Sequence, residues 1–317
     1  WTPSEVVCEV PTFRPDIERE IDLVEEVGRI IDYNTIPAPE TANYLVPAPI
    51  PFHEHFLQKV SKAAQMAGFR EIYTNSLLPH EKALHFAAAE DLVETLNPVS
   101  KEMTTLRPTM VHGMLTAMAY NFNRNAHSLK FFEIGHTFRK AEQGNWVEGV
   151  QEDIHLILAI GGLNGAEHWD HKPAEWKAFD LKSSLTSILE ALTLNYSEEA
   201  GANGSLLYKD EQGQPIGTLK KVDQALRKVY EVELPVFFAE INLSRIEHLL
   251  EGKDTDILKP IPRFPAFEFD LAVVVAKEVP ASGLLAQIRN SAGTTLSSIE
   301  IFDVFESESI GEGNKSL

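Results

Sequence analysis

The first strong pattern along the chain is a helical one near the amino end. From Ile17 to Ile31 the apolar side chains share one side of a helical wheel at about 100° per residue, and the charged side chains share the other. The apolar set is Ile17, Ile21, Leu23, Val24, Val27 and Ile31, and the charged set is Glu18, Asp22, Glu25, Glu26 and Arg29. Pro15 and Asp16 suit a first helical turn, because proline needs no acceptor there and a carboxylate meets the positive end of the helix dipole. The pattern predicts a helix that begins near Asp16, after a strand over Glu5–Val10.

The rest of the chain mixes helical stripes with apolar strands. Five prolines within residues 37–51 predict an extended linker. The predicted helices cover residues 52–67, 111–122 and 176–192, the predicted strands cover 69–75, 129–139, 154–160 and 236–243, and a hairpin covers 206–219. This order of elements is typical of an α+β domain with a mostly antiparallel sheet.

A second boundary is predicted at the proline-rich string over residues 259–262. Beyond it the pattern predicts a strand over 270–276, a helix over 282–292 and a strand over 295–305. The two boundaries predict three parts, which are residues 1–36, 37–259 and 260–317.

Composition narrows the classes of function. The chain has 317 residues, of which 44% are hydrophobic, so it can bury a core in two or three domains. Its net charge is −19 and its pI is about 5.0, so it repels phosphate backbones, and binding nucleic acid on its own is disfavoured. Cys8 alone cannot form an internal disulfide or a cysteine zinc site, which suits a reducing cytoplasm.

The chain shows no targeting segment. No apolar run approaches the ~18 residues that span a bilayer, so we expect no membrane partner. No signal peptide precedes Trp1, and an opening Trp instead of Met leads us to expect a fragment of a longer cytoplasmic protein.

Candidate chemistry lies on the charged side of the first helix. Asp22, Glu25 and Glu26 are spaced i, i+3 and i+4, so their carboxylates can converge, and Asp16 can reach the same side from the helix start. Hard oxygen ligands clustered without neutralising bases suit Mg²⁺. A solvated acidic face is the alternative, and the spacing leaves both open. Without a cation four close carboxylates repel one another, which predicts a raised pKa for each.

The string around these acids resembles one in the bacterial phenylalanyl-tRNA synthetase beta subunit family. The matching positions are Pro11, Arg14, Asp16, Asp22, Leu23, Glu25, Glu26, Arg29, Tyr33, Ile36 and Pro37. Asp32 departs from the family pattern, in which Gly is usual. The resemblance implies that Asp16, Asp22, Glu25 and Glu26 bind a Mg²⁺ ion shared with the alpha subunit.

Two further stretches resemble the same family. Its central domain is matched by Asn97-Pro98, Leu106-Arg107, Tyr120-Asn121, Phe132-Glu133-Ile134-Gly135 and Phe138. Its ferredoxin-like anticodon-binding module is matched over 262–317 by Phe264-Pro265, Asp270-Leu271-Ala272, Phe302-Asp303-Val304-Phe305 and Lys315-Ser316-Leu317. Phe269 stands where family members usually carry Arg, which weakens any inherited phosphate contact. Half of such a module should leave Leu271, Val273 and Val275 without cover.

The central domain of this family is a catalytic-like fold without catalysis. Residues 52–67 take the place of the first class II synthetase signature, which builds the subunit interface in this family; an ordinary core helix is the alternative. Arg139 lies at a strand end, where the second signature places an Arg that binds ATP phosphate, although such a residue is usually a surface one. The third signature, a Gly-rich turn leading to an Arg at a helix start, is not found, so we expect no catalytic residue.

The resemblance implies an α+β fold, namely a class II aminoacyl-tRNA-synthetase-like antiparallel sheet with helices. A partial winged-helix-like domain and a partial ferredoxin-like domain flank it. It implies a structural and assembly role in an enzyme that attaches phenylalanine to its tRNA with ATP. The alpha subunit would perform the chemistry in an assembly of two alpha and two beta chains. The alternatives are a self-sufficient class II ligase and a tRNA-binding module, and the −19 charge argues against the second.

One motif lies outside the resemblance. His168, Asp170 and His171 fall within four residues and could ligate zinc if a fourth group completed the set. No fourth ligand is suggested nearby, and Lys172-Pro173 favours an ordinary loop.

Overall fold

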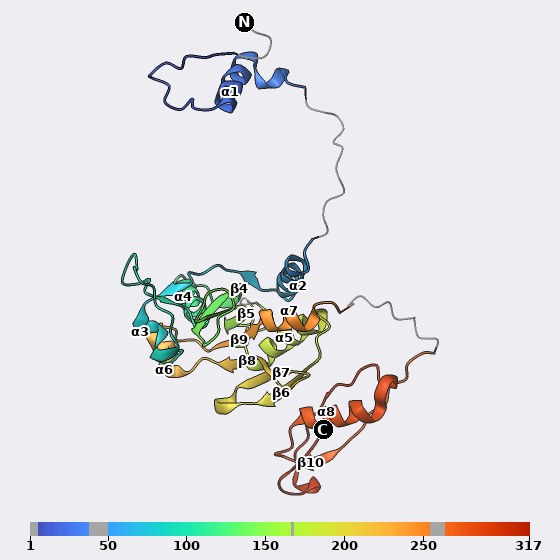
Figure 1. The fold of residues 1–317 in the computed structure, drawn as a ribbon. Coiled ribbons are helices and arrows are strands. Elements are labelled where there is room, and N and C mark those ends of the chain that lie inside the picture. The colour runs from blue at the N-terminus through green and yellow to red at the C-terminus, as the bar shows by residue number, and fades with distance from the viewer. Residues whose placement is uncertain (1–5, 38–49, 166–167, 254–263) are drawn as a thin grey trace. The chain divides into compact units, whose positions relative to one another are not determined.

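A long hairpin organises the main part of the fold. β4 (Ser128–Lys140) and β5 (Val150–Gly162) pair antiparallel along their whole length. The computed structural model describes residues 6–37, 50–165, 168–253 and 264–317, and its contacts divide the chain after Ile50 into two units (Figure 1). Most of the predicted proline linker and the predicted boundary at 259–262 lie outside the described residues.

The described part of the amino-terminal unit holds α1 (Glu20–Ile31) and the short 3-10 helix η1 (Tyr33–Thr35). The helix begins about one turn later than predicted, because the Asp22 carboxylate accepts the backbone N–H groups of Glu18 and Arg19 and so fixes the start. The predicted strand is wrong over residues 6–10, which form none, while Glu5 lies outside the described residues.

The apolar face of α1 is exposed within the described residues. Ile21, Val24, Val27 and Ile31 are each more than half exposed, and a groove of about 490 Å³ runs beside them. Tyr33 folds back onto the helix at Gly28, where a Cβ would lie 2.9 Å from the tyrosine ring. Glycine at this position therefore permits the close approach of the ring.

A seven-stranded sheet forms the centre of the second unit, in the order β1-β4-β5-β9-β8-β7-β6. The other strands are β1 (Arg70–Glu71), β6 (Tyr196–Ala200), β7 (Leu206–Asp210), β8 (Pro215–Lys221) and β9 (Val236–Asn242). Neighbouring strands are antiparallel except β1 and β4, which are parallel. The predicted long strands and the hairpin are confirmed, whereas the strand predicted over 69–75 is reduced to β1.

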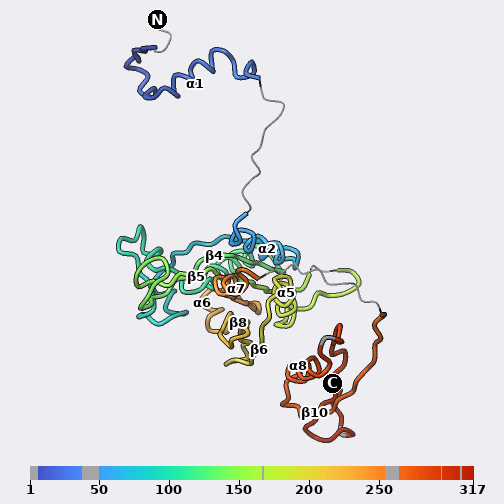
Figure 2. The backbone as a smooth tube through the Cα atoms, turned by 45° about the vertical axis from the view of Figure 1, so that its right-hand side comes forward, coloured from blue at the N-terminus to red at the C-terminus, as the bar shows by residue number. Residues whose placement is uncertain are grey.

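Helices cover both faces of this sheet (Figures 1 and 2). One face carries α2 (Phe52–Met66), α5 (Ala178–Ala191) and α7 (Leu243–Leu250), and the other carries α4 (Val111–Phe122) and α6 (Gln224–Val229). On β5, Leu156 and Leu158 pack in the first core cluster, and Ile157 and Ala159 pack in the second. Both faces of β5 are therefore buried, which explains its continuous apolar run.

The smaller elements of this unit lie in the segment between β1 and α4, except η3, which joins β6 to β7. They are β2 (Leu77–Leu78), α3 (His80–Ala83), η2 (Ala89–Asp91), β3 (Thr105–Leu106) and η3 (Ala202–Gly204). The apolar stripe of α2 is buried in the first core cluster through Phe56, Val60 and Ala64. The predicted interface role of this helix stays a prediction.

The described carboxyl-terminal stretch, residues 264–317, forms a small βαβ arrangement. Its elements are β10 (Val274–Ala276), α8 (Ala281–Ala292), η4 (Gly293–Thr295), η5 (Glu308–Ile310) and β11 (Asn314–Ser316). β10 pairs antiparallel with β11. The strand predicted over 295–305 does not form, and only a single bridge joins Phe305 to Ser316. Leu271 is exposed as expected, whereas Val273 and Val275 are half-buried.

Candidate functional site

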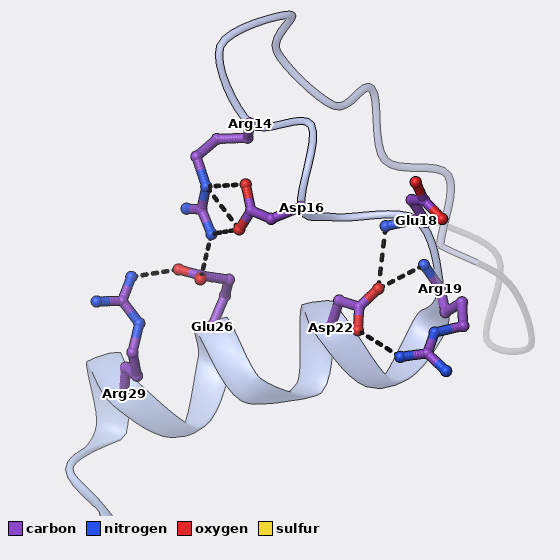
Figure 3. A network of polar contacts seen from close by, with 7 residues as sticks. All are labelled: Arg14, Asp16, Glu18, Arg19, Asp22, Glu26 and Arg29. Atoms are coloured by element: carbon purple, nitrogen blue, oxygen red, sulfur yellow. Dashed lines mark hydrogen bonds and ion pairs between the residues drawn. The ribbon is translucent and has the colours of Figure 1, made fainter. Parts of the chain in front are cut away.

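Two of the four carboxylates predicted to bind a metal, Asp16 and Glu26, contact the guanidinium group of Arg14 (Figure 3). Arg14 Nη2 donates to Asp16 Oδ2 and to Glu26 Oε1, each at 2.6 Å, and Arg14 Nε lies 3.0 Å from Asp16 Oδ1. Arg29 donates to the second oxygen of Glu26. Hydrogen bonds from Arg14 and then Arg29 lower the pKa of Glu26 to about 2, and the bond from Arg14 also lowers the pKa of Asp16.

Asp22 has a different task, because it points at the backbone that starts α1 (Figure 3). Its Oδ2 accepts the N–H of Arg19 at 2.8 Å and the N–H of Glu18 at 3.0 Å. These backbone bonds, Glu18 first, lower the pKa of Asp22. Glu25 is exposed, and its carboxylate makes no hydrogen bond or ion pair within the described part of the chain.

The expectation of unneutralised, mutually repelling carboxylates is wrong in this structure. The pKa values of Asp16, Asp22 and Glu26 are lowered instead of raised, because Arg14, Arg29 and backbone N–H groups stabilise the charged forms. Of the two arginines that bind Glu26, the helical wheel included only Arg29, because Arg14 precedes the helix. In the described residues, no three of the four acids bring ligand oxygens within 4.8 Å of one another.

The donor set nevertheless fits a cation in part. The positively charged Arg14 Nη2 occupies a point that oxygens of both Asp16 and Glu26 reach, so a metal ion in its place could bind the same two oxygens. Two carboxylates from one chain leave most positions of an octahedral Mg²⁺ ion to other ligands. The magnesium assignment stays a prediction.

The sheet of the second unit carries a buried ion pair. Arg107 Nη1 donates to Glu133 Oε1 at 2.9 Å, and the two side chains are 4% and 0% exposed. The Thr74 hydroxyl donates to Glu133 Oε2 at 2.7 Å, and Arg107 Nε donates to the carbonyl of His136 at 2.7 Å. A Cβ at Gly135 would lie 2.2 Å from Arg107 Nη2, so this glycine leaves room for the guanidinium group. The Phe132–Gly135 string thus builds an internal contact.

A second, largely buried acid lies on the same face of the sheet; its side chain is 12% exposed. Glu240 on β9 accepts the Thr109 hydroxyl at 2.5 Å and the backbone N–H of Met110 at 2.8 Å. Met110 begins the turn into α4, so the amino end of that helix closes over this part of the sheet. His155 Nδ1 lies 3.6 Å from Glu240 Oε1.

The order that the third class II signature requires is present, although the sequence did not reveal it. β9 runs directly into α7, and Arg245 lies in the first turn of that helix. A Gly-rich turn is replaced by Asn242, whose side chain accepts the N–H of Arg245 at 2.8 Å. This capping pattern was the signal that could have located the helix start.

Arg245 is not free for a phosphate, because it is bound to a buried acid. Its Nε and Nη2 donate to Asp210 Oδ2 at 2.8 and 2.5 Å, and the Asp210 side chain is 1% exposed. Burial raises the pKa of Asp210, but hydrogen bonds from Gln214, Arg245 and Gln212 outweigh it, and the pKa is lowered. Arg139, the other candidate, is exposed and makes no ion pair within the described residues.

The fold defines the class of protein, a synthetase-type, mostly antiparallel sheet beside which Arg107 and Arg245 are each bound to a buried acid. The solved structure of a pyrrolysyl tRNA synthetase from Desulfitobacterium hafniense shares this fold, with a TM-score of 0.50 and 18% identity over 64% of this chain and 68% of that one. This likeness and the ferredoxin-fold match confirm the predicted α+β class.

Three domain families match the sequence. The phenylalanyl tRNA synthetase beta chain CLM domain matches residues 36–243, the ferredoxin-fold anticodon binding domain matches 262–317, and the tRNA synthetase B5 domain matches 2–33. The chain belongs to the phenylalanyl-tRNA synthetase beta chain family, as the sequence predicted. The predicted part boundaries at 36 and 259 stay predictions.

Relatives extend the match over the whole chain. The phenylalanine–tRNA ligase beta subunit of Salinibacter ruber is 32% identical over 98% of this chain and 40% of its own length. That of Hahella chejuensis is 31% identical over 100% of this chain and 39% of its own length. The chain thus spans about two fifths of these relatives. Within the described residues, no helix combines the length and apolarity that a bilayer crossing requires.

Proposed function

We propose that this chain is the non-catalytic assembly region of the beta subunit of a cytoplasmic enzyme that attaches phenylalanine to its tRNA with ATP. The alpha subunit performs the chemistry, in an assembly of two alpha and two beta chains. The observation that carries the proposal is that two arginines beside the sheet are bound to acids of the same chain. Arg107 is bound to Glu133 and Arg245 to Asp210, and both acids are buried.

An adenylate-forming site needs cationic groups placed to meet phosphate charge as it develops. A guanidinium group already held by a buried carboxylate cannot turn to phosphate without leaving that carboxylate unpaired, which costs several kcal/mol. This argues against the self-sufficient ligase. The family match over 262–317 supports a tRNA contact, which we place within the assembled enzyme because the chain's own charge is −19.

We further propose that Asp16, Asp22, Glu25 and Glu26 contribute to a Mg²⁺ site shared with the alpha subunit. The bound ion would neutralise carboxylates of both subunits across their contact. In the chain by itself Arg14 does this for Asp16 and Glu26, and Asp22 holds the start of α1. Arg14 must release the two oxygens before a cation reaches them.

The isolated chain should be catalytically silent. We expect no phenylalanine-dependent exchange of pyrophosphate into ATP by the purified chain, because Arg107 and Arg245 are each held by a buried carboxylate. The measurement includes the chain co-expressed with an alpha subunit as a positive control. Exchange by the chain free of alpha subunit would overturn the assembly role.

Co-expression also tests the partner directly. The mass of the purified complex should correspond to alpha and beta chains in equal number. Recovery of the chain without alpha subunit, under conditions in which both are soluble and abundant, would contradict the proposal.

A further inference from the structure

The loop between β5 and α5 has no part in the proposed function. Its residues 168–171 are all exposed. His168, Asp170 and His171 each offer one ligand atom, and the three atoms lie within 4.8 Å of one another. In the described part of the chain this is the one group of three His, Cys, Asp or Glu side chains that meets this condition.

The local geometry explains why the three groups gather. The backbone N–H of Asp170 points at Nδ1 of His168, 3.3 Å away, and draws the loop into a turn. The two imidazole rings then lie with their centroids 5.0 Å apart and their planes 30° from parallel. Asp170 Oδ2 lies 3.8 Å from His171 Nδ1. The loop therefore places two imidazoles and a carboxylate around one point.

The nitrogen and oxygen donors of these side chains determine which metal ion the loop can bind. Two imidazoles and one carboxylate suit a borderline divalent cation such as Zn²⁺ or Ni²⁺, whereas Mg²⁺ and Ca²⁺ prefer oxygen ligands alone. Exposure of the loop lets water complete the coordination, so a fourth protein ligand is not required for binding. It also means that the ion adds little to the fold, since no core packs around it.

We propose that His168, Asp170 and His171 form an exposed binding site for a borderline divalent cation, and that the bound ion is Zn²⁺. The site is independent of the proposed assembly role and of the acidic helix. Its ligands are nitrogen and oxygen, whereas the acids around Arg14 are oxygen donors only. The two sites are thus distinguished by the cation that each prefers.

Trp169 supplies a local reporter of this site. It is 90% exposed, and its ring centroid lies 5.6 Å from that of His168. A paramagnetic Ni²⁺ ion held by the neighbouring histidines should quench its fluorescence. Replacing Trp169→Phe should remove the quenching while leaving zinc affinity unchanged, because the indole is not a ligand.

The test uses the tag-free 317-residue chain and calorimetric titration with ZnCl₂ at neutral pH. We expect one ion per chain, and about a tenfold or greater loss of affinity when His168→Ala and His171→Ala are combined. Asp170→Asn should give a smaller loss. Binding should weaken at pH 5.5, because protons compete for imidazole nitrogen.

A matched control removes two other exposed imidazoles. His55→Ala with His85→Ala changes the same number of histidines, neither of which belongs to a group of three possible ligands among the described residues, and should leave zinc affinity unchanged. Absence of zinc binding by the parent chain would overturn the proposal. So would equal affinity in the parent and the His168/His171 variant, or an equal loss in the control.

Discussion

Replacing Glu133→Leu should destabilise the sheet by about 3–5 kcal/mol, the cost of leaving one member of a buried ion pair without its partner. Arg107 would keep its charge in a site where its side chain is 4% exposed, and Thr74 would lose its acceptor. The loss is best measured as the opening free energy of β4 and β5 amides in native-state hydrogen exchange, since the chain contains more than one unit.

Two further variants separate charge from packing. Arg107→Met combined with Glu133→Leu should recover much of the loss, because removing both charges leaves neither unpaired. Glu152→Leu on the same hairpin removes the acid that faces His136 at the surface and should cost less than about 1 kcal/mol. If Glu133→Leu lowers the opening free energy of the β4 and β5 amides no more than Glu152→Leu does, the buried ion pair does not stabilise this part of the sheet.

The sequence predicted the elements whose pattern is local. β5 could be located because Leu156 to Ile160 are buried on both faces, and α2 and α4 because their apolar stripes are complete. Elements that depend on a partner were harder. A strand needs the hydrogen bonds of its neighbour, so the apolar run over 295–305 reads as a strand but forms none in this structure.

The candidate site shows the same contrast between local patterns, which the sequence reveals, and contacts between distant residues, which it does not. Spacing on one helix placed Asp22, Glu25 and Glu26 on one face but left a magnesium site and a solvated acidic face both open. It did not show Arg14, which reaches Glu26 from twelve residues away, or the Asp210–Arg245 pair, which spans 35. Such pairs depend on how the chain folds back, and that information is absent from a helical wheel. The start of α1 was misplaced for a related reason, since Asp22 caps the helix from inside it.

Neutralising Asp16→Asn and Glu26→Gln together should weaken assembly with an alpha subunit about tenfold or more in magnesium buffer, because the variant loses both oxygens that meet at one cation position. Asp22 is left in place because it starts α1. Addition of a chelator should weaken the parent complex and leave the variant complex nearly unchanged. The readout is the dissociation constant of the two subunits, with and without EDTA.

Matched variants distinguish an effect of the bound Mg²⁺ ion on assembly from an effect of negative charge alone. Glu18→Gln with Glu20→Gln removes the same charge from exposed neighbours and should leave assembly unchanged. Arg14→Gln removes the counter-ion shared by Asp16 and Glu26, so each carboxylate loses the hydrogen bond that lowers its pKa most, and Glu26 keeps only Arg29 on its other oxygen. In this variant the two oxygens that Arg14 held become available to a cation. Its complex should therefore depend on magnesium at least as strongly as the parent complex. If the Asp16/Glu26 variant assembles as tightly as the parent and the chelator affects neither, these acids bind no shared ion and α1 presents a solvated acidic face held by arginines.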